Sequence, residues 1–218
     1  MSRPLRVALV EDDVLLRALI AELVDAQEAM EVVATASGQR AALDAIAPGT
    51  ADVAVLDIDL DDGNGIALGL ALQEQDPRIQ VLLLSNHNML GLVRSVAARA
   101  PSPWSYLSKR SVARSGQLVR ALAAVAHRQV VIDPALADRS VPLDDSPLSR
   151  LSAAQFRVLQ LVAQGDGNGA VAEHLGITTK AVESHLTAIY KLLDLEGGAN
   201  NRVAAVLAFL QQSVRPEM

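Results

Sequence analysis

The sequence predicts an α/β doubly wound domain followed by an all-α domain. In residues 1–126, short apolar runs alternate with longer stretches of helical periodicity, which is typical of parallel strands connected by helices. From residue 148 onward only helical periodicity remains. Between the two parts, residues 127–147 are interrupted by Pro134, Pro142 and Pro147 and predict a linker with a short helix inside it. A length of 218 residues suits two domains.

The apolar runs of the first part predict five strands, at 5–10, 31–34, 53–56, 80–84 and 104–107. Helices are expected at about 14–26, 39–47, 65–75, 89–99 and 111–126. The fourth strand is apolar throughout, as a strand covered by helices on both faces requires. These elements predict a flavodoxin-like sheet with the strand order 2-1-3-4-5.

The second part, 148–218, predicts four helices, at 152–164, 168–175, 179–193 and 201–211. Ser152 and Asn168 are expected as N-caps of the first two. Gly176 is expected to end the second helix, and Thr178 or Thr179 to cap the third.

Composition excludes several classes of protein and site. The chain has no cysteine, which excludes disulfides, thiolate metal sites and a cysteine nucleophile. A formal net charge of −6 provides no global basic field for nucleic acid. No apolar run approaches the roughly 20 residues of a membrane span, and the N-terminus does not resemble a signal peptide. We therefore expect a cytoplasmic protein without a membrane partner.

Polar residues follow the predicted strands and share one edge of the sheet. They are Glu11, Asp12 and Asp13 after the first strand, Asp57 after the third, Ser85 after the fourth and Lys109 after the fifth. The strand order is expected to bring Asp12, Asp13 and Asp57 together. Clustered carboxylates need a cation, and oxygen ligands of this kind suit Mg²⁺. A carboxylate beside the metal can attack phosphorus, while Lys109 and Ser85 contact phosphate oxygens.

Residues 1–126 resemble the receiver domain of bacterial response regulators. The matching residues are Asp12-Asp13, Asp57 with Gly65 eight residues on, Ser85, Tyr106 and Lys109. The resemblance implies that Asp57 accepts a phosphoryl group from a sensor histidine kinase. It implies that Asp12, Asp13, Asp57 and the backbone carbonyl of Asp59 bind Mg²⁺. Ser85 would move toward the phosphate and Tyr106 would follow it.

Two other motifs overlap the stretch 57–68. The run from Asp57 imitates a calcium loop, but its sixth position is Asp62 and its twelfth is Leu68, where the motif needs Gly and Glu. The run 53–60 also resembles the DxD motif of haloacid-dehalogenase-type phosphatases, although Leu60 departs from it. A small phosphatase with Asp57 as nucleophile therefore stays an alternative.

The helices at 168–175 and 179–193 are joined by Gly176-Ile177-Thr178, which is the plan of a helix-turn-helix. The segments 151–159, 163–165, 171–177 and 182–186 resemble the LuxR-type DNA-binding domain over about 148–211. Together with the receiver domain, nearly the whole chain therefore resembles the NarL/FixJ class of response regulators. By this resemblance Lys180, Ala181, Glu183, Ser184 and Thr187 face bases or phosphates, and Lys191 meets the DNA backbone.

Charges within 148–212 balance. Five cations, Arg150, Arg157, Lys180, Lys191 and Arg202, stand against five acids, Asp166, Glu173, Glu183, Asp194 and Glu196. DNA affinity rests largely on phosphate neutralisation, so one copy should bind weakly. We expect phosphorylation to promote a homodimer that binds promoter DNA, in a regulator that is not an enzyme. A receiver that controls DNA binding without phosphorylation is the alternative.

Overall fold

The computed structural model describes residues 3–86, 102–112, 116–138, 140–195 and 200–214. It divides into two compact units, Met1–Arg128 and Gln129–Met218. Within the described residues, no helix is long and apolar enough to cross a membrane.

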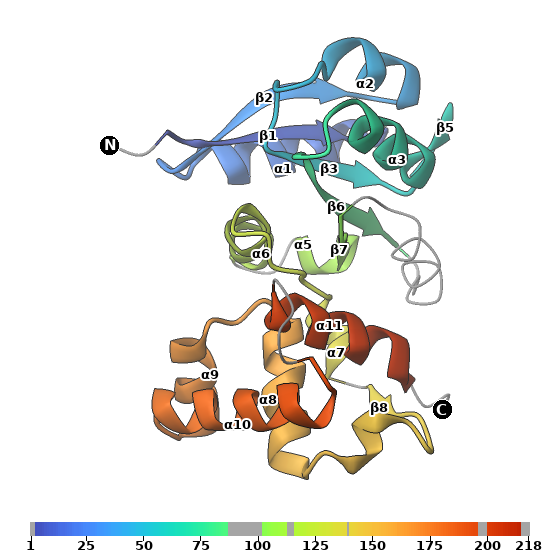
Figure 1. Cartoon of the computed structure of the whole chain (residues 1–218). Helices are drawn as coiled ribbons and strands as arrows, with labels where there is room; N and C mark the ends of the chain where they lie inside the picture. The colour runs from blue at the N-terminus through green and yellow to red at the C-terminus, as the bar shows by residue number, and fades with distance from the viewer. Residues whose placement is uncertain (1–2, 87–101, 113–115, 139, 196–199, 215–218) are drawn as a thin grey trace. The chain divides into compact units, whose positions relative to one another are not determined.

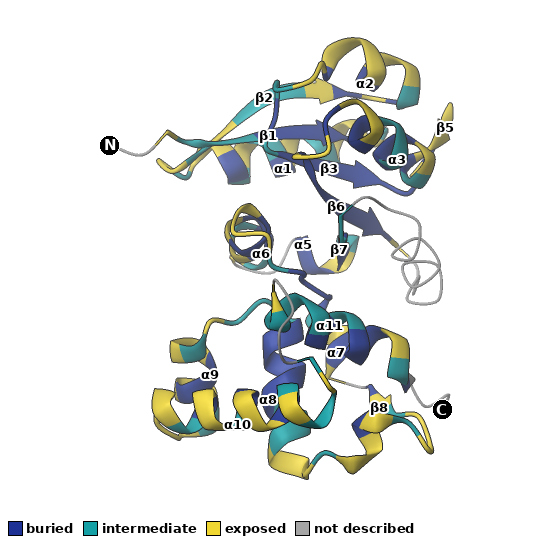
Figure 2. Ribbon diagram, in the orientation of Figure 1, coloured by how far each residue is buried: buried dark blue, intermediate teal, exposed yellow. Residues whose placement is uncertain are grey.

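The first unit is built on a five-stranded parallel sheet with the order β2-β1-β3-β6-β7, as predicted (Figure 1). Its strands are β1 (Leu5–Val10), β2 (Met30–Ala36), β3 (Val53–Asp57), β6 (Gln80–Ser85) and β7 (Ser105–Ser108). A separate hairpin, β4 (Asp59–Leu60) with β5 (Gly63–Asn64), follows β3. Every residue of β3 and β6 is buried, in agreement with their uninterrupted apolar sequences (Figure 2).

Helices flank this sheet, which confirms the doubly wound class (Figure 1). They are α1 (Val14–Asp25), α2 (Gln39–Ala45), α3 (Gly65–Gln75), α5 (Lys109–Val112) and α6 (Gln117–Ala126). The helix expected at 89–99 lies outside the described residues. The helix expected at 111–126 is described as α5 and α6, and α5 already begins at Lys109.

Trp104 precedes β7 and is buried against α3. Its indole Nε1 donates a hydrogen bond to Gln73 Oε1 over 2.7 Å. A Cβ atom added to Gly69 would lie 2.8 Å from the Trp104 ring, so the small residue makes room for the indole. The fifth strand was expected to begin at Trp104, but it begins one residue later, at Ser105.

The second unit is helical. Its main helices are α8 (Ala153–Ala163), α9 (Asn168–Leu175), α10 (Thr179–Leu192) and α11 (Asn201–Gln212), preceded by the short α7 (Pro134–Ala137) and the 3₁₀ turn η1 (Pro147–Arg150). A two-residue antiparallel pair joins β8 (Val141–Pro142) to β9 (Ser213–Val214). The four expected helices are all found, and no end differs from the expectation by more than one residue.

Part of the segment 127–147, expected as a linker, packs against α8. Its residues 130–132 are buried, and the backbone N–H of Ile132 donates to the Ala163 carbonyl over 2.6 Å. Gln160 Nε2 donates to the carbonyls of Ala137 and Ser140 at 3.1 and 3.2 Å. From Gln129 onward the segment therefore belongs to the second compact unit.

Helix ends follow the sequence signals with one exception. Ser152 forms a capping box with Gln155, and the Thr178 hydroxyl accepts from the Ala181 N–H at 3.1 Å. Gly176 ends α9 in the left-handed region at φ 64°. Asn168 was expected as an N-cap, but Gly167 holds that position and Asn168 is the first residue of α9. Its Oδ1 accepts from Arg202 Nη1 of α11 over 3.0 Å.

Candidate functional site

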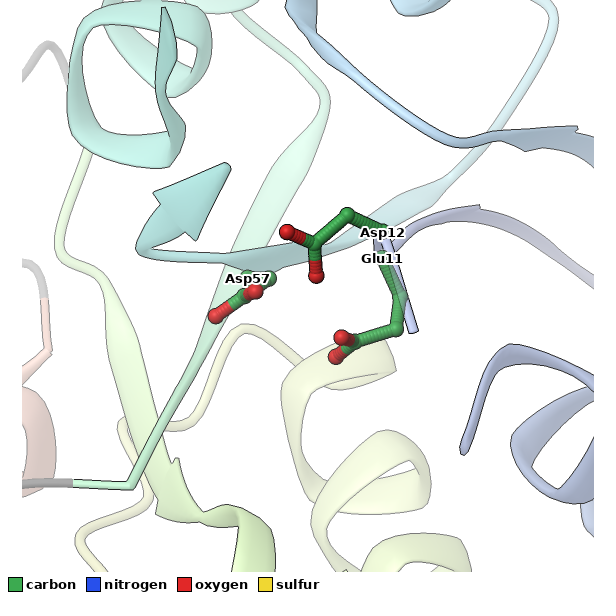
Figure 3. A group of neighbouring side chains, drawn as sticks. All are labelled: Glu11, Asp12 and Asp57. Atoms are coloured by element: carbon green, nitrogen blue, oxygen red, sulfur yellow. The ribbon is translucent and has the colours of Figure 1, made fainter. Parts of the chain in front are cut away.

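Three acidic side chains meet at the carboxyl ends of β1 and β3. Carboxylate oxygens of Glu11, Asp12 and Asp57 all lie within 4.8 Å of one another (Figure 3). Glu11 and Asp12 follow the last residue of β1, and Asp57 is the last residue of β3. Because β1 and β3 are parallel neighbours, both ends reach the same edge of the sheet.

Lys109 joins this cluster from the fifth strand. It is the first residue of α5, directly after β7, and its Nζ lies 2.8 Å from Asp57 Oδ2 and 2.8 Å from Glu11 Oε1. Its own side chain is 12% exposed, while the two carboxylates are almost fully buried. A single ammonium therefore bridges two buried acids that lie 46 positions apart in the chain.

Burial and the shared lysine determine the protonation of the cluster. Burial raises the pKa of Glu11 to about 7, although its hydrogen bond with Lys109 opposes the shift. Burial likewise raises the pKa of Asp57 against the same lysine. For Lys109, burial alone would lower the pKa, but the hydrogen bonds to Asp57 and Glu11 outweigh it and the pKa rises.

The cluster has capacity for a cation beyond Lys109. Among the described residues, Glu11 Oε2 has no hydrogen-bond partner although it is buried. Three carboxylates against one ammonium leave negative charge uncompensated when all are ionised. Hard oxygen donors of this kind fit a small divalent cation, so the residues present suit a metal ion.

Asp13, expected in the acidic cluster, lies outside it. Its Oδ1 accepts from the backbone N–H groups of Leu15 and Leu16 at 2.8 and 3.0 Å, so Asp13 is the N-cap of α1. These hydrogen bonds lower the pKa of its exposed carboxyl. Glu11 takes the place that we assigned to Asp13. The signal that separates them is the helix that begins at Val14, since an Asp immediately before a helix is a capping residue.

The remaining expected residues of the first unit lie at or near this edge. The Asp59 backbone N–H donates to Asp57 Oδ1 over 3.3 Å, so the backbone after β3 turns back toward the Asp57 carboxylate. Ser85 is the buried last residue of β6. In the pairing of β6 with β7 it lies opposite Ser108, which directly precedes Lys109. Tyr106 is buried two residues earlier on β7. The structure thus gathers the strand ends, while the roles of these residues stay predictions.

Gly65 fixes the backbone behind Asp57. Its N–H donates to the Ile58 carbonyl over 3.0 Å, and a Cβ added to it would lie 1.9 Å from the Asp57 carbonyl oxygen. Only a glycine allows α3 to begin this close to the end of β3. The spacing of eight residues between Asp57 and Gly65 therefore has a steric cause.

In the second unit, α10 carries the residues expected at DNA. Lys180, Glu183, Ser184, Thr187 and Lys191 are exposed, and Ala181 is partly buried. Val182, Leu186 and Ile189 are buried on the opposite side of the helix. Most of the outer surface of α10 is exposed (Figure 2). The Ser184 and Thr187 hydroxyls donate to the carbonyls of Lys180 and Glu183, each over 2.9 Å.

Two family models match the chain. The response regulator receiver domain matches residues 7–123, and the luxR family of bacterial regulatory proteins matches residues 149–209. The first match contains the acidic cluster and Lys109, and the second contains α9 and α10.

Curated relatives match over nearly the full length. A nitrate/nitrite response regulator protein homolog of Haemophilus influenzae is 26% identical over 98% of this chain and 100% of its own. The DNA-binding transcriptional activator DevR/DosR of Mycobacterium tuberculosis is 27% identical over 97% of each chain, and the nitrate/nitrite response regulator NarP of Escherichia coli is likewise 27% identical over 97% of each.

Solved structures support the fold. The RcsB response regulator of Salmonella typhimurium superposes with a TM-score of 0.53 at 20% identity, covering 96% of this chain and 99% of its own. The receiver domain of NarL from M. tuberculosis gives 0.52 at 24% identity and covers 58% of this chain and 98% of its own. The chain belongs to the NarL/FixJ family of two-component response regulators, with an N-terminal receiver domain and a C-terminal LuxR-type DNA-binding domain.

Proposed function

We propose that this response regulator accepts a phosphoryl group from a sensor histidine kinase on Asp57, and that phosphorylation promotes dimerisation and binding to promoter DNA. The observation that carries the proposal is the contact of Lys109 Nζ with Asp57 Oδ2 at 2.8 Å. It places a cation beside a buried carboxylate at the sheet edge where ligands of such folds bind.

In the transfer, an Asp57 carboxylate oxygen forms a bond to phosphorus as the bond from phosphorus to the kinase histidine nitrogen breaks. Lys109 then pairs with the negative oxygens of the new acyl phosphate. Asp12, Asp57 and the backbone carbonyl of Asp59 are the proposed ligands of Mg²⁺, with Glu11 beside them. When bound, Mg²⁺ supplies positive charge that offsets the repulsion between the carboxylates and the incoming phosphoryl group.

The signal passes from the acyl phosphate to Ser85 and Tyr106 in this proposal. Ser85 ends β6 on the same sheet edge as Asp57, and Tyr106 lies on the adjoining strand β7. The balanced charge of residues 148–212 supports dimerisation as the output, because two half-site contacts joined in one dimer add their binding energies. A structure titled "two RcsB dimers bound to two parallel DNAs" has the same fold, with a TM-score of 0.53 at 20% identity.

Incubation with a small phosphodonor and Mg²⁺, followed by intact mass measurement, tests the phosphorylation step. We expect one hydroxylamine-labile phosphoryl group per wild-type chain and none on Asp57→Asn, which keeps the shape of the side chain and loses the nucleophilic oxygen. Asp13→Asn is the matched control, because Asp13 lies outside the cluster and asparagine also caps helices, so it should be phosphorylated normally.

Other outcomes of this experiment decide against the proposal. Phosphorylation of Asp57→Asn at the wild-type level would place the acceptor elsewhere. Repeated turnover of a generic phosphate ester would favour the phosphatase alternative. Equal promoter affinity of wild type before and after phosphorylation, measured with labelled DNA, would favour a receiver that works without phosphorylation.

A further inference from the structure

The exposed side of α10 carries one acidic residue within the group assigned to DNA. Glu183 lies three residues after Lys180 and four before Thr187, and all three are exposed. It is the fifth residue of α10, in the N-terminal part of the helix. In a helix-turn-helix, the N-terminal residues of the second helix contact base edges in the major groove.

Glu183 has no structural task within the described part of the molecule. Its carboxylate forms no ion pair or hydrogen bond with any described residue, although Lys180 lies one turn away. Two other acids lie nearby, but neither is comparable to Glu183. Asp166 contacts His174 at 3.6 Å, and Glu173 lies on α9 and not on α10. The carboxylate is therefore available to a ligand of α10.

A carboxylate in the major groove faces two rows of phosphates, which weakens binding unless it meets a hydrogen-bond donor. The bases present two donors in that groove, the N4 amino group of cytosine and the N6 amino group of adenine. On adenine the neighbouring N7 is an acceptor and repels the second carboxylate oxygen. Guanine presents two acceptors, and thymine presents one acceptor and a methyl group. Cytosine is the base that suits a carboxylate.

The other side chains of this face are weaker acceptors. The Ser184 and Thr187 hydroxyls donate to backbone carbonyls of α10 itself, each over 2.9 Å, and their neutral oxygens accept more weakly than a carboxylate does. Ala181 offers no polar atom, and Lys180 is a donor. The longest and most strongly accepting group on this part of the helix is the Glu183 carboxylate.

We propose that Glu183 is a specificity-determining residue that selects a cytosine in each half-site by accepting a hydrogen bond from its N4 amino group. The inference deepens the proposed function, since it rests on α10 binding promoter DNA. It also gives a role to an acid on the DNA-facing side of α10, although residues 148–212 carry no net positive charge. The unfavourable charge is offset at sites with cytosine and left uncompensated at others.

Selection from a random double-stranded DNA library, followed by sequencing, tests this inference. The full-length protein is used after treatment with phosphodonor and Mg²⁺, as wild type, Glu183→Ala, Glu183→Gln and Glu173→Ala. Glu173→Ala is the matched control, because it removes the same charge from an exposed position on α9. Melting curves check that each variant is folded.

We expect wild type and Glu173→Ala to enrich the same motif, with one cytosine position that Glu183→Ala no longer requires. Replacing that cytosine should weaken wild-type binding about 5- to 150-fold, and Glu183→Ala binding much less. Glu183→Gln should prefer adenine there, because glutamine pairs with N6 and N7 together. The inference would be overturned if Glu183→Ala kept the wild-type motif unchanged, or if the base preference that Glu183→Ala loses were for a base other than cytosine. In both cases the proposal that α10 binds promoter DNA would stand. Enrichment of no motif by wild type would overturn both.

Discussion

In the receiver domain, charged side chains from three strand ends are buried in mutual contact, whereas on α10 they stand singly on an exposed helix face. Lys109 touches both Asp57 and Glu11, so its removal leaves two buried carboxylates without their shared cation. Lys180 and Lys191 lie in solvent. The difference teaches that substitutions at the phosphoacceptor site couple stability to function, while substitutions on the exposed face of α10 should change recognition with little effect on stability.

Removal of Lys109 should have the largest effect. In Lys109→Ala, Glu11 and Asp57 lose their cation, and we expect the free energy of unfolding of the receiver domain to fall by about 3–5 kcal/mol. Lys191→Ala, the control on α10, should change stability by less than about 0.5 kcal/mol because the side chain is exposed. Denaturant unfolding in the absence of metal measures both. If the two substitutions lowered the free energy of unfolding equally, the proposed difference between the buried cluster and the exposed face of α10 would be wrong.

The loss in Lys109→Ala should also depend on pH. Burial raises the pKa of Glu11 and Asp57, so the folded variant binds protons more tightly than the unfolded chain. The contribution of these two carboxyls to the stability of the variant is therefore largest below their ordinary pKa and is lost as pH rises through their raised folded pKa values. A loss that is the same at pH 5 and pH 8 would show that the two carboxyls are not the cause.

Replacement of glycine by alanine should change stability in opposite directions at one position in each domain. Gly65→Ala puts a Cβ atom 1.9 Å from the Asp57 carbonyl oxygen, so we expect a destabilisation of about 1–3 kcal/mol and slower phosphorylation. Gly169→Ala, in the exposed first turn of α9, meets nothing within 4 Å and should stabilise by up to about 1 kcal/mol. Thermal unfolding of both variants and phosphorylation rates check this. Destabilisation by both would show that the free space at Gly169 does not decide the outcome.

The two domains also differ in how far sequence predicts them. Strand order and the meeting of Asp57 with Lys109 could be predicted, because parallel strands place their carboxyl ends on one edge. Apolar patterns alone do not separate Glu11 from Asp13, and the choice follows only when Asp13, the residue immediately before α1, is recognised as its N-cap. The exposed face of α10 followed directly from helical periodicity.

The segment 127–147 is a second place where the sequence did not predict packing. Its prolines correctly suggested irregular backbone, but Val130, Val131 and Ile132 are buried next to α8. Short apolar runs between prolines carry no period, so sequence does not reveal whether they pack. A fragment prepared to study DNA binding should therefore begin at Gln129 and not at residue 148.

The smallest expected effect is on α10. Lys180→Ala removes one exposed cation from the DNA-facing side of α10, within residues 148–212, whose charges balance. If Lys180 contacts a phosphate, affinity should fall for all sequences alike, and the slope of log affinity against log salt should fall by about one. Titration of labelled promoter DNA at several salt concentrations measures this slope. Arg40→Ala, which removes an exposed cation from α2 in the receiver domain, controls for net charge and should leave the slope unchanged. If Lys180→Ala instead preserved the slope but altered the preferred bases, Lys180 would be a base-reading residue, and α10 would discriminate bases with both a cation and the Glu183 carboxylate.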